Sequence, residues 1–384
     1  LMAHEDQWGF LSRIRVLSPF ELDGLNRRCT PRLSASMDER DFQLRCDEGI
    51  IEPAAVEPQR GKIPSRVEIT LTSHLSIPLA GLPSRVVAAL KRSATFPNPK
   101  FYELQRMRMA TYPHPRFIFS GEERPDALIM PRGGMDKILS LLKKAGAEVS
   151  VVDGRPRRRK IAAVFAGNLR DAQQAALDEL KKHEYGVLVA PPGSGKTVIA
   201  CALIAERQVS TLVVVHRSPL VEQWRDRICE FTGTEKKEIG TISGARSKPT
   251  GKIDIAMIQS LARNPDMDVF SKRYSQVIVD ECHHIPASSF EGVLRQIQSR
   301  YVLGLTATPY RKDGLERIIF QQCGPARYEI RPSDLSPGIS REVMVRETGL
   351  RLPEPIGQNP PYHVLAEHLT NDPGRNAIIA DDIA

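Results

Sequence analysis

One stretch in the middle of the chain, residues 190–197, reads APPGSGKT and follows the apolar run Tyr185 to Ala190. In such a loop, small residues let backbone N–H groups converge on phosphate oxygens, a lysine supplies positive charge and a threonine hydroxyl can ligate Mg²⁺. The helix that we expect to begin here adds the positive end of its dipole. We therefore predict a nucleotide phosphate site formed by Pro192, Gly193, Ser194, Gly195, Lys196 and Thr197.

Two adjacent carboxylates end a second apolar run. Asp280 and Glu281 follow Val277–Val279 directly. An aspartate at the end of a strand can hold Mg²⁺ together with Thr197, and a glutamate beside it can polarise an attacking water. We therefore expect the catalytic residues to be Glu281, Asp280 and Lys196, with Thr197 and Asp280 as the magnesium ligands.

Further polar side chains flank the same kind of apolar run. Thr306 and Thr308 follow the run that begins at Tyr301, and His283 and His284 follow the carboxylate pair. Adjacent histidine side chains diverge and no third ligand is evident, so we do not expect them to bind a metal. We predict that His283 couples the nucleotide site to motion and that His284 is structural.

Apolar runs alternate with segments long enough for helices from about residue 162 onward. This alternation predicts a doubly wound, mostly parallel α/β sheet with its ligands at the carboxyl ends of the strands. Gln173 opens a helix just upstream of the glycine-rich loop, where its amide could read an adenine edge. The expected strands lie at residues 185–190, 210–216, 254–259, 276–280 and 301–306.

The order and spacing of five segments resemble motifs I, Ia, Ib, II and III of superfamily 2 helicases and translocases, of the DEAD/DEAH-box (DECH) kind. The segments read APPGSGKT, VVVHRSPLVEQW, DIAMIQSL, VIVDECHH and GLTATPYRKDG. The resemblance implies a RecA-like ATP-binding domain with Mg²⁺ as cofactor and Gln173 as the adenine contact. It also implies that Thr306 and Thr308 couple ATP to motion, and that Arg217 and Gln259 contact the nucleic-acid backbone.

The resemblance implies an ATP-dependent DNA helicase or translocase. Two alternatives stay open: the motor subunit of a restriction-type endonuclease, and a nucleotide-gated DNA clamp with little hydrolysis. Motifs IV to VI of the superfamily do not occur in the sequence. We therefore expect residues 331–384 to begin a second RecA-like domain, and we expect the chain to bind nucleotide but to hydrolyse it weakly, because the second domain supplies an arginine to the transition state.

A small α+β module is expected at residues 67–160, before the RecA-like domain at 161–330. Its segments TFPNPKFYELQRMRM and ALIMPRGGMDKILSLL resemble the module that precedes the motor in XPB-like and phage helicases. Residues 91–119 interleave basic and aromatic side chains, which predicts either a DNA contact through Lys100, Arg106 and Arg108 or a partly buried sheet. We place Phe117 and Phe119 in the core.

The first 66 residues are less informative, and we expect a tail of an upstream domain followed by a linker. The segment AHEDQWGFLSRIRVLS is similar to the primase-to-helicase junction of the TOTE conflict systems, which implies a primase or nuclease domain in a longer chain. A net charge of +8 favours a polyanionic partner. No run of about 18 apolar residues occurs, so we expect a cytoplasmic protein without a membrane partner.

Overall fold

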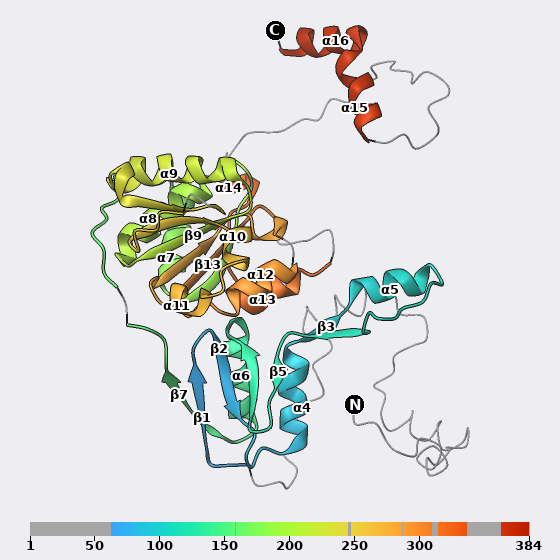
Figure 1. Cartoon of the computed structure of the whole chain (residues 1–384), viewed down its shortest axis with the longest axis vertical. Helices are drawn as coiled ribbons and strands as arrows, with labels where there is room; N and C mark the ends of the chain where they lie inside the picture. The colour runs from blue at the N-terminus through green and yellow to red at the C-terminus, as the bar shows by residue number, and fades with distance from the viewer. Residues whose placement is uncertain are drawn as a thin grey trace. The chain divides into compact units, whose positions relative to one another are not determined.

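The computed structural model describes residues 63–157, 159–244, 247–285, 287–308, 314–335 and 362–383. The chain divides into two compact units, Leu1–Arg155 and Pro156–Ala384 (Figure 1). The opening segment that is similar to primase-to-helicase junctions lies outside the described residues. Within the described ranges, no helix is both long and apolar enough to cross a bilayer.

The second unit is built on a seven-stranded sheet in which every neighbouring pair is parallel. Every residue of the strands β8, β9 and β12 is buried, as in a parallel sheet covered on both faces. Across the sheet, the strands are β10 (Ile239–Ile242), β11 (Ile253–Met257), β9 (Thr211–Val215), β12 (Gln276–Val279), β13 (Tyr301–Thr306), β8 (Tyr185–Val189) and β14 (Ala326–Glu329). The predicted doubly wound α/β fold is confirmed.

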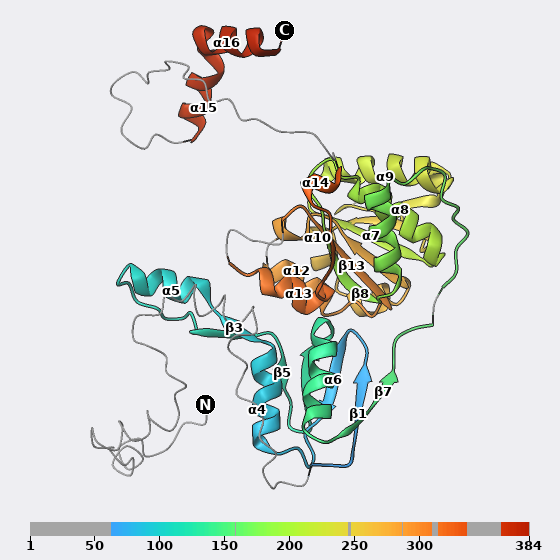
Figure 2. The same ribbon diagram turned by 180° about the vertical axis from the view of Figure 1, so that it is seen from behind.

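Helices cover both faces of this sheet (Figures 1 and 2). On one face, α8 packs against both α7 and α9; on the other, α12 packs against both α10 and α13. The first layer consists of α7 (Asp171–Lys181), α8 (Lys196–Arg207) and α9 (Ser218–Thr232), and the second of α10 (Ile258–Ala262), α12 (Ala287–Leu294) and α13 (Glu316–Cys323). Short helices α11 (Met267–Ser271) and α14 (Pro332–Leu335) and the paired helices α15 (Tyr362–Asn371) and α16 (Pro373–Ile383) complete the unit.

The first unit contains a five-stranded mixed sheet with two helices. Residues of β1 alternate strictly between exposed and buried, so one face of the sheet is apolar. Helices α4 (Ser84–Ser93) and α6 (Met135–Lys144) contact each other and contribute to the same apolar core. The strand order is β5 (Glu122–Glu123), β6 (Ala127–Pro131), β2 (His74–Pro78), β1 (Arg66–Leu71) and β7 (Glu148–Asp153).

Val151 to Asp153 form the end of β7 and pair in parallel with β1. One prediction for this unit is wrong. Phe117, expected in the core, is 51% exposed. It lies on a two-stranded ribbon of three-residue strands, which is too short to bury both of its faces. Phe119 on the same ribbon does pack against the core of the unit.

Residues 95–119 form an extension of the first unit that we call the arm (Figure 1). Its strands β3 (Thr95–Pro97) and β4 (Phe117–Phe119) pair with each other in a separate antiparallel ribbon. Between them lies α5 (Pro99–Arg106), in which no residue is buried. The segment expected to contact DNA therefore forms a structure of its own, attached to the unit through the ribbon.

Candidate active site

The polar motifs of the second unit meet because their strands are neighbours. The sheet places β9, β12, β13 and β8 side by side and parallel, so their carboxyl ends share one edge. The glycine-rich loop follows β8, Asp280 follows β12, and Thr306 ends β13. Ligands of such sheets bind at this edge, which makes it the candidate active site.

The glycine-rich loop adopts the left-handed backbone that its glycines allow. Gly193 and Gly195 have φ angles of +77° and +83°. The Ser194 side chain between them is buried, and its hydroxyl oxygen has no hydrogen-bond partner. An unpartnered hydroxyl inside a loop of small residues fits a loop that closes around a polar ligand.

Gln173 joins this loop to the N-cap of α7 through the two ends of its amide. Its Nε2 donates to the carbonyl of Ser194 at 2.8 Å, and its Oε1 accepts from the backbone N–H of Arg170 at 3.0 Å. The side chain is 96% buried, which leaves 4% exposed. A Cβ atom on Gly195 would lie 2.3 Å from the Gln173 amide nitrogen. Gln173 therefore supports the loop, a role that the sequence did not indicate.

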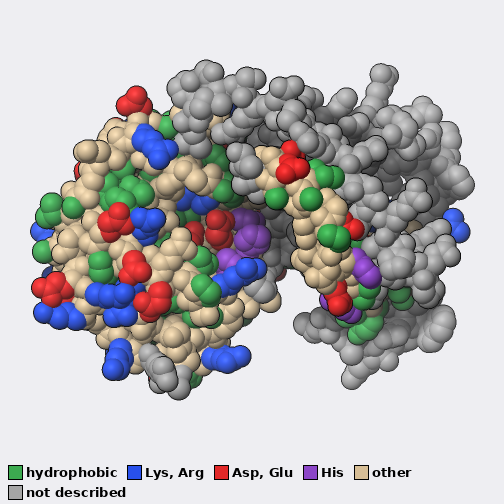
Figure 3. Space-filling model, turned by 90° about the horizontal axis from the view of Figure 1, so that it is seen from above, with side chains coloured by type: hydrophobic (Ala, Val, Ile, Leu, Met, Phe, Trp, Pro, Cys, Tyr) green, Lys and Arg blue, Asp and Glu red, His purple; other side chains and the backbone are tan. Residues whose placement is uncertain are grey.

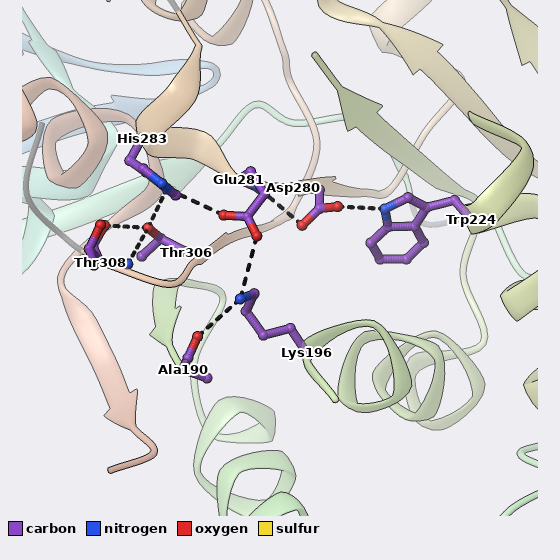
Figure 4. Close-up of polar contacts among 8 residues, drawn as sticks. All are labelled: Ala190, Lys196, Trp224, Asp280, Glu281, His283, Thr306 and Thr308. Atoms are coloured by element: carbon purple, nitrogen blue, oxygen red, sulfur yellow. Dashed lines mark hydrogen bonds and ion pairs between the residues drawn. The ribbon is translucent and has the colours of Figure 1, made fainter. Parts of the chain in front are cut away.

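Lys196 points from the first turn of α8 toward the carboxylate pair (Figure 4). Its Nζ donates to the carbonyl of Ala190 at 3.0 Å and lies 3.4 Å from Oε1 of Glu281. The Ala190 N–H in turn donates to the carbonyl of Thr306 at 2.9 Å. The ammonium is thus held between the loop and the candidate water-activating glutamate, where an anion could replace Glu281 as its partner.

Asp280 is fixed by two hydrogen bonds. The indole Nε1 of Trp224 donates to its Oδ2 at 2.7 Å, and the Glu281 N–H donates to its Oδ1 at 2.9 Å. Burial raises the pKa of the Asp280 carboxyl above its ordinary value, while the Trp224 hydrogen bond lowers it. Sequence analysis missed Trp224; a tryptophan that is buried needs an acceptor for its N–H, but the sequence does not name that acceptor.

Glu281 connects the carboxylate pair to the end of β13. Its backbone is left-handed, with φ of +44°, so the chain turns sharply after β12. Its Oε2 is buried without a hydrogen bond, 3.4 Å from Nδ1 of His283. The same Nδ1 lies 2.8 Å from the Thr306 hydroxyl. Because this carboxylate oxygen has no hydrogen-bond partner, it fits a group that receives a proton from water.

The hydroxyl of Thr306 settles which tautomer His283 adopts. That hydroxyl donates its single hydrogen to the carbonyl of Thr308 and accepts from the Thr308 N–H at 3.2 Å. With that hydrogen donated to Thr308, the hydroxyl accepts from His283, and we therefore assign a hydrogen to Nδ1 of His283. Thr308 contributes only its backbone to this network, and its side chain is exposed.

A third histidine, which sequence analysis did not single out, joins this edge. The rings of His283 and His284 are 3.9 Å apart, and that of His216 lies 5.5 Å from His284. Burial, with a further contribution from His284, lowers the pKa of His216. Histidine and acidic side chains gather in a recessed part of one face of this unit (Figure 3). The imidazoles pack against each other, and their position next to Glu281 makes His216 and His284 part of the site.

The two residues expected at the nucleic-acid backbone lie on neighbouring loops. Arg217 is the exposed N-cap of α9, directly after β9, and Gln259 is exposed at the start of α10, directly after β11. Nε2 of Gln259 donates to the backbone carbonyl of His216 at 3.2 Å. The other predicted contacts, Lys100, Arg106 and Arg108, lie on the arm of the first unit.

The residues present fit a magnesium nucleotide. The loop with its left-handed glycines, the buried Lys196 and the N-terminus of α8 together present positive charge and N–H groups that can bind phosphate oxygens. Thr197 and Asp280 offer oxygen atoms, which Mg²⁺ prefers to nitrogen or sulfur. Each Asp280 oxygen accepts a hydrogen bond and keeps a further lone pair for a metal or its water shell.

Comparison with known families and proteins gives consistent matches. Residues 166–311 match the family described as "Type III restriction enzyme, res subunit". The "DNA 3'-5' helicase XPB" of Kineococcus radiotolerans is 33% identical over 215 residues, which cover 53% of this chain and 38% of that protein. That of Mycobacterium tuberculosis is 35% identical over 167 residues, covering 42% and 30%. The chain thus spans about a third of the length of these relatives.

A third relative, the "DNA 3'-5' translocase XPB2" of Sulfurisphaera tokodaii, is 31% identical and covers 49% of this chain and 41% of that protein. Among solved structures, the UvsW helicase from Bacteriophage T4 aligns with a TM-score of 0.54 at 16% identity, covering 69% of this chain and 100% of that chain. This likeness concerns the fold. The second unit therefore has a RecA-like fold, and its sequence is similar to the family of the type III restriction res subunit and to the XPB helicases named above.

Proposed function

We propose that this chain carries the ATP-binding and ATP-hydrolysing domain of a DNA helicase or translocase. The observation that carries the proposal is the contact of Lys196 Nζ with Glu281 Oε1 at 3.4 Å. This contact lies at the carboxyl ends of the parallel strands, where Asp280 follows β12 and Thr306 ends β13. A phosphate-binding cation beside a water-activating carboxylate is the arrangement that nucleotide hydrolysis requires.

Each group has a distinct role in this proposal. Backbone N–H groups of Gly193 to Thr197 and the Lys196 ammonium bind the phosphates, and Thr197 and Asp280 hold Mg²⁺. Mg²⁺, when bound, neutralises charge that develops on the phosphate oxygens. Glu281 orients a water molecule and accepts its proton. Its Oε2, which has no hydrogen-bond partner, supports this role. Gln173 supports the loop and contacts the adenine with the Nε2 hydrogen and Oε1 lone pair that its bonds to Ser194 and Arg170 leave over.

The proposed route from nucleotide to DNA runs through hydrogen bonds at the sheet edge. Loss of the Lys196 contact frees Glu281, which lies against His283, and His283 donates to Thr306. Arg217 and Gln259 contact the DNA backbone from the loops after β9 and β11. Gln259 is hydrogen-bonded to the His216 carbonyl, and the His216 ring packs against His284. The proposed DNA contact at Gln259 is therefore connected to the histidines beside Glu281.

Two kinds of support favour DNA as the partner. Three relatives are named as DNA helicases or a DNA translocase, and the net charge of +8 suits a polyanion. The family description at residues 166–311 favours a second candidate, the motor of a restriction-type endonuclease. In that case the same ATP site would serve cleavage by residues elsewhere in a longer protein.

The ATP site is tested by nucleotide binding. Fluorescent ADP and ATP analogues are titrated into the chain with Mg²⁺, into Lys196→Ala and into Lys144→Ala, which removes an exposed lysine of the first unit. We expect binding by wild type and Lys144→Ala and a loss of at least about tenfold in Lys196→Ala, because a charge-assisted phosphate contact contributes more than about 1.4 kcal/mol. Equal binding by all three proteins contradicts the site.

The motor function is tested by ATP turnover, with and without DNA, of a protein that includes the expected second RecA-like domain, because that domain supplies an arginine to the transition state. Glu281→Gln keeps the shape of the side chain and removes the base, so we expect nucleotide binding to persist while turnover falls about 10²- to 10⁴-fold. Single-stranded DNA, duplex DNA and RNA are compared as activators. Nucleotide binding without activation by any of these nucleic acids would favour the nucleotide-gated clamp over the motor.

A further inference from the structure

The arm displays a cluster of exposed large apolar side chains. Of the nine large apolar side chains that are exposed in the described ranges, four lie between residues 107 and 117. Their exposed fractions are 55% for Met107, 57% for Met109, 91% for Tyr112 and 51% for Phe117. Single exposed apolar residues are common, but a cluster in one short loop marks a binding surface.

The same loop is strongly basic. Residues 106–116 read RMRMATYPHPR and contain three arginines, one histidine and no acidic residue. The acid nearest to it in sequence, Glu103, pairs with Lys100 at 2.9 Å. Within the described ranges, Arg106 and Arg108 are exposed and belong to no ion pair. Positive charge and exposed rings therefore occupy one surface.

The arm has a defined structure that fixes how these side chains are displayed. The Asn98 N–H donates to the carbonyl of Arg116 at 2.9 Å, and its Nδ2 donates to the carbonyl of Pro115 at 2.8 Å. Nε of Arg116 donates to the Tyr102 hydroxyl at 3.1 Å, and the guanidinium lies 5.5 Å from the centre of the Phe117 ring. These contacts hold the C-terminal end of the loop against the N-cap and first turn of α5, and the C-terminus of α5 leads into the other end, so less ordering is required when a ligand binds.

We propose that the arm loop, residues 106–117, binds single-stranded nucleic acid. Tyr112 stacks on an unpaired base, Arg106 and Arg108 contact phosphates, and Met107 and Met109 cover the sugar and base edges. An exposed ring can stack only on a base whose face is free, which a duplex interior does not offer. This inference rests on the proposed DNA motor function and names the strand form that the first unit contacts.

The stacking step is tested with a matched pair of oligonucleotides. Fluorescence anisotropy of the full chain is measured with oligothymidine and with a strand of the same length that carries abasic sites, so only the bases differ. We expect Tyr112→Ala to weaken oligothymidine binding about 5- to 150-fold, the range for loss of one base stack. On the abasic strand Tyr112→Ala and wild type should bind alike, and Tyr112→Phe should retain wild-type affinity for both strands.

The phosphate contacts are tested by salt dependence. For single strands, log K falls with log salt, and the magnitude of this slope decreases by about 0.7 for each phosphate contact that is lost. We expect this change for Arg108→Gln and no change for Lys144→Gln, an exposed lysine on α6. Val164→Ala, which removes part of a side chain that is 72% exposed in the second unit, serves as the apolar control.

The outcomes separate this proposal from the motor function. If the wild type binds DNA and DNA activates its ATP turnover, but Tyr112→Ala binds both strands like wild type, the arm proposal is overturned and the motor stands. Equal loss on oligothymidine and on the abasic strand also overturns stacking. If oligoglutamate displaces the oligonucleotide at equal charge concentration, the loop is a site for an acidic protein instead. Because Tyr112 is 91% exposed, the variant should melt at the wild-type temperature.

Discussion

The indole of Trp224 donates a hydrogen bond of 2.7 Å to Oδ2 of Asp280, and both side chains are buried. Trp224 lies on α9, whose N-cap is the exposed Arg217. The helix that begins at a proposed DNA contact thus also positions the carboxylate that we expect to hold Mg²⁺. Movement of α9 on the sheet would change the position of the indole donor and with it the orientation of Asp280.

Replacing Trp224 with Phe keeps most of the packing and removes the donor. We expect the free energy of unfolding to fall by about 1 to 3 kcal/mol, because a buried charged acceptor loses its partner. Affinity for ADP should fall more in the presence of Mg²⁺ than in EDTA, because the metal contact requires an oriented Asp280. Urea unfolding and paired titrations with and without Mg²⁺ measure the two effects.

A purely structural role for Trp224 would lower stability and leave the ratio of the two ADP affinities unchanged. The chain has only two tryptophans, Trp8 and Trp224, so Trp8→Phe leaves a single indole reporter. In that variant we expect Mg-ADP to change the indole fluorescence. An emission that is insensitive to Mg-ADP would argue against metal binding at Asp280.

The glycines of the phosphate loop offer a matched comparison. Gly193→Ala and Gly195→Ala both place a side chain at positive φ, which costs about 1 to 2 kcal/mol. An added Cβ meets nothing within 4 Å at Gly193 but lies 2.3 Å from Gln173 Nε2 at Gly195. We therefore expect Gly195→Ala to lower the melting temperature and the nucleotide affinity more than Gly193→Ala does.

Combining Gly195→Ala with Gln173→Ala removes the close approach of the two side chains. The double variant should therefore be less destabilised than the sum of the two single changes. Additive effects in thermal unfolding would show that Gln173 does not support the loop.

Thr306→Val retains the shape of the side chain and removes its hydroxyl. That hydroxyl bonds to the backbone of Thr308 and accepts from His283. We expect nucleotide affinity to change by less than about threefold, while activation of turnover by DNA is lost, because the Glu281 to β13 connection is broken. Thr306→Ser, which keeps the hydroxyl, should restore activation; failure of this rescue would point to packing of the methyl group instead.

Glu291 lies on α12, outside the candidate active site, and we expect it to make the stability of the protein depend on pH. Burial raises the pKa of its carboxyl above 4.5, and the charge of Arg295 offsets this only in part. The folded state therefore keeps the proton to higher pH than the unfolded state, so this contribution to stability is complete below pH 4.5 and is lost as the pH rises through the folded-state pKa.

Glu291→Gln has no proton to lose and should lack this decline. We expect its stability relative to wild type to increase as the pH rises from 4.5 toward neutrality, measured by urea unfolding at several pH values. The exposed Glu68→Gln serves as the control. A stability difference that does not vary with pH would contradict a raised pKa.

Much of the second unit could be predicted from local sequence. The runs at β8, β9, β11, β12 and β13 are rich in apolar residues, and the glycine-rich loop and the carboxylate pair make the ends of β8 and β12 recognisable. The edge strands β10 and β14 were not predicted, because they are short and contain polar residues such as Thr241, Arg327 and Glu329. Pairing with a buried neighbour makes them strands, and only the fold supplies that neighbour.

The sequence by itself determined the doubly wound fold and the residue types that we propose bind phosphate and activate water. Tertiary structure decided which side chains position these residues. Trp224 is hydrogen-bonded to Asp280, Gln173 to the backbone of Ser194, and His283 to Thr306. It also decided that Phe117 and Tyr112 are displayed on an arm instead of buried. The physical reason is that periodicity reports on one strand or helix, whereas these contacts join residues up to 56 positions apart, whose proximity depends on the order of strands in the sheet.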